Sequence, residues 1–212
     1  MHLKKINKII KYLILSDLAL WSGLGLVTPV FAIFILERVG GTALSVGIAV
    51  SIYWVVKSLF QYPAGLFLDH RRGDTDDYLF LVFGTFIVSM IPFAYLLATT
   101  DWHVYVFQFF YGIGMAMCIS GWRAIFTRNI DKGHEAADWS LDDAVLGFGT
   151  GISGLVSGYL VYKFGFVPSF IVAGTCGLIG VIFLICLRKD IVGNFDKKRL
   201  LNFFKIFSKR IK

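Results

Sequence analysis

Charged residues are scarce in this sequence. They make up 17% of its 212 residues, and hydrophobic residues make up 57%. A soluble domain carries about 25% charged residues and about 45–50% apolar ones. The composition therefore excludes an ordinary soluble domain and indicates a membrane protein. We expect the function to reside in the membrane-spanning bundle, its loops or its tail, because the remaining segments are too short for a soluble domain.

Other features that are missing exclude particular classes of protein. The three cysteines, Cys118, Cys176 and Cys186, lack the spacing of a disulfide framework or a metal site, so we expect no metal and no cofactor. The stretch Gly151–Gly154 has the nucleophile pattern of a rhomboid protease, which also needs a histidine on a later helix. No histidine follows His134, and the paired Asn-Pro-Ala loops of a water channel are absent. The sequence thus predicts a protein that is not an enzyme.

Long apolar stretches dominate what is present, and each is long enough for a transmembrane helix of about 20 residues. The first is longer than a signal-peptide core and has no small-x-small cleavage site, so we interpret it as a retained helix. The predicted fold is all-α, a polytopic membrane protein with a bundle over residues 12–187, a basic amino terminus over 1–11 and a basic tail over 188–212. The six predicted spans are Tyr12–Leu36, Thr42–Phe67, Tyr78–Ala98, Val104–Trp122, Leu141–Tyr162 and Val167–Leu187.

Basic residues indicate how the chain is oriented. If the amino terminus lies inside, Arg38 and Lys163 fall outside and Lys57 lies within a span, which leaves 18 of the 21 lysines and arginines in cytoplasmic segments. This asymmetry predicts that both termini are cytoplasmic and that the protein lies in the cell membrane. The net charge of +7 is then explained by topology, and a nucleic-acid partner is unnecessary.

The tail has an amphipathic pattern. A helix from Lys197 onward would place its apolar residues on one stripe and its basic residues on the other face. Such a helix is typical of one that lies on an anionic cytoplasmic leaflet, and a calmodulin-like partner is the alternative. The apolar stripe consists of Leu200, Phe203, Phe204, Phe207 and Ile211.

The loop after the second span carries dense charge in the sequence GLFLDHRRG. It resembles the loop signature of the major facilitator superfamily, in which a glycine, three residues and an aspartate precede basic residues around a second glycine. Gly65, Asp69, Arg71, Arg72 and Gly73 have the character of that signature. A histidine replaces the arginine that usually follows the aspartate. An ordinary solvated connection is the alternative interpretation.

Two later helices add to the resemblance. The fourth span contains QFFYGIGMA, which is similar to the fourth-helix motif of the family except that Gln108 replaces its arginine. The fifth span contains GTGISGLVSG where antiporters of the family have a glycine-proline motif, and no proline is present. These departures argue against the best-known type of proton-coupled drug antiporter. The small residues that we expect to pack helices in the fifth span are Gly149, Ser153, Gly154, Ser157 and Gly158.

The resemblance covers one half of a twelve-helix facilitator. It implies two inverted three-helix repeats, with GYLVYKFG after the fifth span as a weak echo of the first loop. It also implies a secondary-active transporter that moves a small polar or charged solute by alternating access. A homodimer is favoured, since a lone half would expose mid-membrane charges to lipid at about 2.5–3.5 kcal/mol each. A fragment, and a non-transporting scaffold or accessory subunit, are the alternatives.

Polar stripes on three spans are predicted to line the solute cavity. For Asp17 and Lys57 three interpretations stay open. They form a structural ion pair, or Lys57 attracts an anionic solute group while Asp17 exchanges protons, or each is separately solvated. The stripes contain Asp17 and Trp21 on the first span, Tyr53, Lys57 and Gln61 on the second, and Gln108, Tyr111 and Trp122 on the fourth.

The resemblance further implies a latch between two halves. Asp69 would face the start of the fifth helix of a second copy, with Arg123 or Arg128 as its charge partner. Ser140 is the predicted N-cap of that helix, which would place Asp142 in its first turn.

Overall fold

The computed structural model describes residues 7–71, 73–130 and 132–210, with side chains for 7–70, 73–130 and 132–191. Within these ranges six helical spans are long and apolar enough to cross a membrane. The prediction of an all-α fold with six spans is therefore confirmed. The first span consists of α1 (Lys8–Val27), η1 (Thr28–Val30), α2 (Phe31–Phe34) and η2 (Ile35–Val39), and the others are α3 (Ala43–Arg71), α4 (Asp74–Tyr95), α5 (Asp101–Asn129), α6 (Glu135–Phe164) and α7 (Phe166–Arg210).

The first span is broken where Pro29 enters it. Proline lacks a backbone N–H, and the chain passes through a 3₁₀ turn at this point. The carbonyl of Leu26 accepts hydrogen bonds from the hydroxyls of Ser157 in α6 and Ser169 in α7. The break in the first span is therefore held by two other helices.

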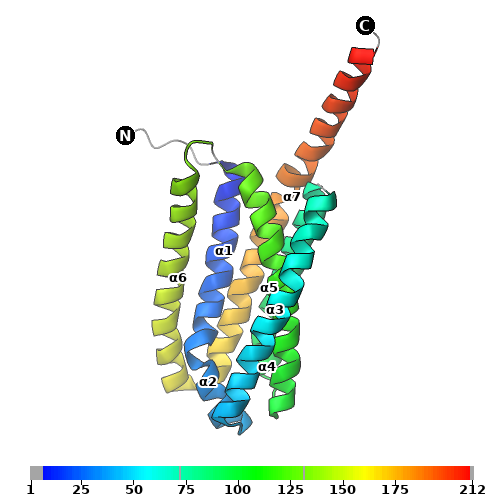
Figure 1. Cartoon of the computed structure of the whole chain (residues 1–212). Coiled ribbons are helices and arrows are strands. Elements are labelled where there is room, and N and C mark those ends of the chain that lie inside the picture. Colours follow the sequence, from blue (N-terminus) through cyan, green and yellow to red (C-terminus); the bar gives the residue numbers. More distant parts are fainter. Residues whose placement is uncertain (1–6, 72, 131, 211–212) are drawn as a thin grey trace.

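The helices pack as an open series. α3 packs on α5, α5 on α4, α4 on α7, α7 on α1, and α1 on α6. α3 and α6 are the ends of this series, without a major contact between them in the described residues, and α6 stands at one edge of the bundle (Figure 1). We call the side of the bundle between α3 and α6 the open side.

The two helices at the ends of this series are also the most exposed. In the most apolar 18-residue stretch of α6, 6% of the stretch is buried inside the bundle, and in that of α3 the share is 17%. The corresponding share is 44–50% in the other four spans. The two helices at the ends of the series thus have the fewest neighbours of their own chain.

The pairing of helices is symmetric. Exchanging α1, α3 and α4 for α5, α6 and α7 leaves the set of major contacts unchanged: α4 on α5 becomes α7 on α1, and α3 on α5 becomes α6 on α1. Two related three-helix repeats would pack in this way, and their inverted relation stays a prediction.

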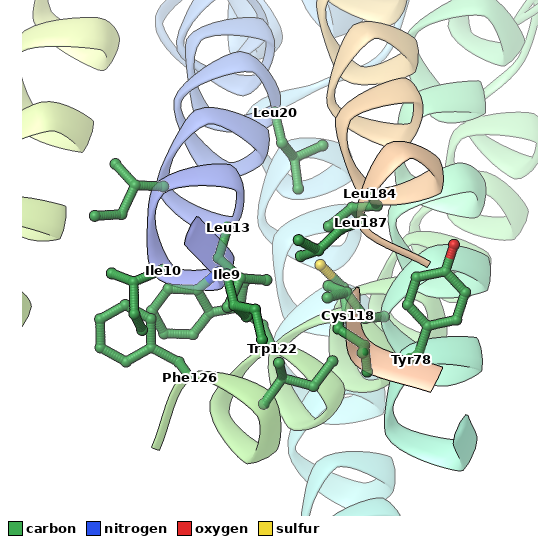
Figure 2. Packing of buried hydrophobic residues seen from close by; sticks show 14 of the residues in the cluster. Ile9, Ile10, Leu13, Leu20, Tyr78, Cys118, Trp122, Phe126, Leu184 and Leu187 are labelled. Atoms are coloured by element: carbon green, nitrogen blue, oxygen red, sulfur yellow. The ribbon is translucent and has the colours of Figure 1, made fainter. Parts of the chain in front are cut away.

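A hydrophobic core joins α1, α4, α5 and α7 at the end of the bundle where the chain begins. Ile10 and Leu13 of α1 meet Trp122 and Phe126 of α5, with Leu187 of α7 beside them (Figure 2). All five side chains are buried. This core fixes α1 against α5.

Glycines bring α5 close to its neighbours. A Cβ added to Gly112 would lie 2.9 Å from the carbonyl oxygen of Tyr53 in α3, and one added to Gly114 would lie 2.8 Å from Ile87 Cγ2 in α4. Small residues at such points allow close helix packing in a membrane. The two glycines of the QFFYGIGMA segment therefore position α3 and α4 on opposite sides of α5.

The predicted start of the fifth span is wrong. α6 begins at Glu135, so Ser140 lies inside the helix and does not cap it, and Asp142 lies beyond the first turn. The residues EAADWS continue the helix outside its apolar part, because alanine and glutamate are good helix formers. The Glu135 carboxylate accepts the Gly133 N–H at 3.0 Å, where the helix begins.

The start of α1 lies next to the part of α7 where the bundle ends. Lys8 at the start of α1 forms an ion pair of 2.8 Å with Asp190 of α7. Beyond this point α7 continues as a helix that projects past the bundle (Figure 1). The tail side chains from residue 192 lie outside those described, so the amphipathic stripe stays a prediction.

Candidate functional site

A central cavity of about 360 Å³ lies between the first span, α3, α4 and α5. It brings together five of the residues predicted to bind the solute. Further aromatic residues, Trp54 and Tyr95 among them, complete its wall. The five predicted residues are Trp21, Tyr53, Lys57, Gln108 and Tyr111.

Aromatic rings hold Lys57 in this cavity. Its Nζ lies 4.4 Å from the ring centroid of Trp54 and 5.7 Å from that of Tyr53. Tyr53 in turn stacks on Tyr111 at 4.4 Å between centroids. Cation–π contacts of this kind contribute about 0.5–2 kcal/mol. The ammonium group is thus held by rings rather than by a carboxylate.

The ion pair between Asp17 and Lys57, one of the three interpretations that the sequence leaves open, does not form in this structure. No salt bridge joins them among the described residues, and Asp17 lines a different cavity. Lys57 lines the central cavity, whereas Asp17 lines a second one. Trp21 lines both cavities and forms a wall between them.

A polar group of the central cavity also lacks a partner. Gln108 is buried, and its Oε1 accepts no hydrogen bond from any described residue. A buried amide that is left unsatisfied costs about 1–3 kcal/mol. Gln108 is therefore suited to bind a polar group that enters the cavity.

The second space, which we call the carboxylate cavity, has a volume of about 160 Å³. It is lined by three residues of the predicted solute site, Asp17, Trp122 and the shared Trp21. Its remaining polar residues are Arg123 from α5 and Asp142 and Asp143 from α6. Seven of the eight residues predicted to bind the solute thus line these two cavities, which share Trp21.

The third space, the loop cavity, has a volume of about 710 Å³ and lies between α3 and α5. It is lined by Gln61, which was predicted in the solute site, and by Gly65, Asp69, Arg123 and Arg128 of the predicted latch. Gln61 therefore lies with the latch residues rather than with the central cavity.

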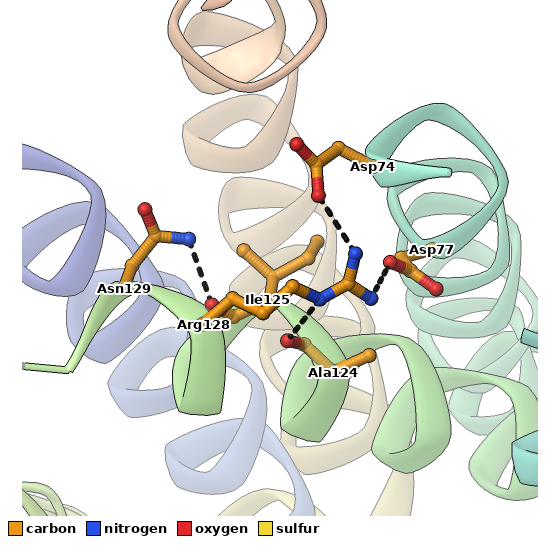
Figure 3. Close-up of polar contacts among 6 residues, drawn as sticks. All are labelled: Asp74, Asp77, Ala124, Ile125, Arg128 and Asn129. Atoms are coloured by element: carbon orange, nitrogen blue, oxygen red, sulfur yellow. Dashed lines mark hydrogen bonds and ion pairs between the residues drawn. The ribbon is translucent and has the colours of Figure 1, made fainter. Parts of the chain in front are cut away.

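Arg128 forms a clip with α4. Its Nη1 donates to Asp74 at 2.8 Å, its Nη2 donates to Asp77, and its Nε donates to the Ala124 carbonyl at 3.1 Å (Figure 3). The Asp77 side chain is fully buried. This clip joins the end of α5 to the start of α4.

Because Arg128 is bound to α4, Arg123 is left as the candidate charge partner for Asp69. Arg123 lines the loop cavity as well as the carboxylate cavity. Gly73 precedes α4 in an extended conformation. Arg72 and the side chain of Arg71 lie outside the described part of the chain, so their predicted role is not tested.

Comparison with known proteins identifies the family. The sequence matches the family model of the Major Facilitator Superfamily over residues 13–206. The chain belongs to this superfamily. A search of the curated proteins gave no match. The chain is thus a multi-pass membrane protein of a transporter family, as the loop and helix motifs indicate.

The small residues predicted to pack helices in the fifth span lie on two different faces of α6. A Cβ on Gly149 would meet Ser22 Oγ at 2.6 Å, and Ser153 and Ser157 are buried. In contrast, a Cβ on Gly154 or Gly158 would meet no described atom within 4 Å. The serines and Gly149 pack α6 on α1, whereas Gly154 and Gly158 lie on its uncovered face.

The sequence also contained a pattern that places Asp142 on the buried face of α6. The incorrect prediction of an N-cap at Ser140 drew attention away from it. Counting back from Ser157 in steps of three or four gives Ser153, Gly149, Leu146 and Asp142, all on the face of α6 that meets α1. Asp142 is buried and lines the carboxylate cavity opposite Asp17. The clip residues Asp74 and Asp77 carried no comparable signal, since acidic residues are common in a first helical turn.

Proposed function

We propose that this facilitator moves a small polar or charged solute by alternating access, as a homodimer, and that Lys57 receives an anionic group of the solute. The observation that carries the proposal is the position of Lys57. It lies on the wall of the central cavity with aromatic contacts and has no ion pair within the described residues.

The energetics favour an anionic group. A charge at membrane depth costs about 2.5–3.5 kcal/mol, and such residues usually mark a substrate pathway. The rings of Tyr53 and Trp54 offset part of this cost for Lys57. A carboxylate or phosphate that enters the cavity would offset more of it. Gln108 Oε1 then offers an acceptor for a hydroxyl or amine of the same solute.

The homodimer is supported by the open side. The uncovered face of α6 presents glycines in steps of four, three and four residues, and a Cβ on any of them would meet no described atom within 4 Å. Such a stripe allows another helix to approach closely. A second copy that packs between α3 and α6 would cover the cavities from the other side. The glycines are Gly147, Gly151, Gly154 and Gly158.

Alternating access then requires the two copies to rock. Asp69 is exposed at the loop cavity, where a helix of the second copy can reach it. We assign Arg123 as its charge partner within the chain. The cell membrane as location and cytoplasmic termini complete the proposal, on the distribution of lysine and arginine.

The leading alternative is a scaffold or accessory subunit that keeps the fold without the cycle. An aromatic plug in the cavity would favour it. Aromatic rings do line the central cavity, but about 360 Å³ of space is left beside Lys57 and Gln108. This volume is in the range of a small-molecule pocket. Transport is therefore the function that the cavity supports better.

Uptake into proteoliposomes tests the proposal. The wild type should take up at least one member of a panel of labelled carboxylates, amino acids and phosphorylated solutes. Lys57→Met should abolish this uptake while the protein still elutes as a folded species, and Lys57→Arg should retain part of it. Uptake that is equal in Lys57→Met and wild type would exclude the assigned role of Lys57.

A further inference from the structure

The carboxylate cavity contains two buried acidic side chains that contribute to no ion pair in the described chain. Asp17 from α1 is 7% exposed, and Asp142 from α6 is 3% exposed. The charged residues that line this cavity are Asp17, Asp142, Asp143 and Arg123, so its lining is net negative. Two buried carboxylates are costly unless a cation compensates them.

Two polar atoms on the cavity wall have no partner. Asp142 Oδ1 is a buried acceptor without a hydrogen bond, and Trp122 Nε1 is a buried donor without one, within the described residues. Both residues line the same cavity of about 160 Å³. The occupant that suits this wall must therefore attract a carboxylate and also accept a hydrogen bond from an indole.

A hydrated cation has both properties. The ion binds carboxylate oxygens, and the oxygen of a water in its shell accepts the indole N–H. A water molecule occupies about 30 Å³ in the liquid, so the cavity has room for an ion with a few waters.

The other kinds of cation fit less well. A divalent ion usually takes several acidic ligands, and no group of three His, Cys, Asp or Glu side chains suited to a metal is present in the described residues. An organic ammonium ion needs free ring faces. Here Trp122 stacks on Phe126 at 4.4 Å, and Trp139 packs against Phe126 at 4.6 Å, so these rings cover one another.

We propose that Asp17 and Asp142 bind a monovalent inorganic cation, Na⁺, in the carboxylate cavity, and that this ion is coupled to the solute. The coupling rests on the proposed transport function, whereas the binding does not. Trp21 is the physical link, because it lines both this cavity and the central cavity that contains Lys57. An ion that shifts Trp21 would change the wall of the solute cavity.

Binding can be measured on the purified chain in nanodiscs without any solute. Tryptophan fluorescence is recorded during titration with NaCl against choline chloride, at constant ionic strength and fixed pH. Trp21, Trp122 and Trp139 line the cavity and would report the ion. We expect a saturable response to Na⁺ in the wild type.

The variants locate the site. Asp142→Asn should weaken the apparent Na⁺ affinity by about tenfold or more, since even an outer-shell partner of a metal ligand contributes this much. Glu37→Gln removes the same charge from an exposed residue at the other end of the first span and should leave the response unchanged. Asp17→Asn provides a second test if Asp142→Asn does not elute as a folded species.

Three results would overturn the assignment. They are no Na⁺-specific response in folded wild type, an equal response in wild type and both Asp variants, and a response to pH with none to Na⁺, which would make the ligand a proton. Because no solute is present, failure here leaves the transport proposal intact. Conversely, Na⁺ binding without any uptake would remove the transport proposal and keep the site.

Discussion

The clip at the end of α5 gives the sharpest stability prediction. Arg128→Met would leave the fully buried Asp77 carboxylate without its cation. Removing one partner of a buried ion pair costs about 3–5 kcal/mol. The Arg128 side chain is 37% exposed, so solvent screens part of the interaction and we expect about 3 kcal/mol. For a chain of this size about 1 kcal/mol corresponds to roughly 2–4 °C, so the Tm should fall by ~6–12 °C.

Two comparison variants separate this effect from a general loss of charge. Asp74 pairs with the same arginine but is 30% exposed, so Asp74→Asn should cost about 0–1 kcal/mol, or ~0–4 °C. The double variant Arg128→Met/Asp77→Asn removes the uncompensated charge and should recover most of the lost Tm. Thermal unfolding in one detergent, followed by the monodisperse fraction in size exclusion, measures all three. A Tm for Arg128→Met no lower than that for Asp74→Asn would show that the buried Asp77 carboxylate does not depend on Arg128.

Three further predictions concern transport and assembly. Lys57→Met should remain folded yet take up no solute in proteoliposomes, because the cavity loses its cation. Gly154→Leu should leave the Tm unchanged but weaken self-association in cross-linking, since its Cβ faces open space, whereas Gly84→Leu should prevent folding because a Cβ there meets the Cys118 backbone. Asp69→Asn should shift the balance between inward-open and outward-open forms, measured by paired spin labels, and equal populations would remove the latch.

The sequence was sufficient for the number and order of the spans, since each contains a long apolar window. It was less reliable at their ends. Glu135 begins α6 well before the apolar part, because helix formation continues into polar residues where nothing breaks it.

The rotation of one helix against another was not predictable. Asp17 and Trp21 lie one turn apart on α1, yet Asp17 lines the carboxylate cavity while Trp21 separates that cavity from the central one. Periodicity places residues on one face of a helix, but the neighbour that this face meets depends on close contacts such as Gly112 against Tyr53. For this reason the single predicted solute site is divided among three cavities.

We propose that a second copy covers the open side between α3 and α6. Native mass measurement of the purified chain in nanodiscs tests it most directly. We expect a particle with two copies in the wild type and a particle with one copy in Gly154→Leu. A stable particle with a single copy, unchanged by that substitution, would contradict it.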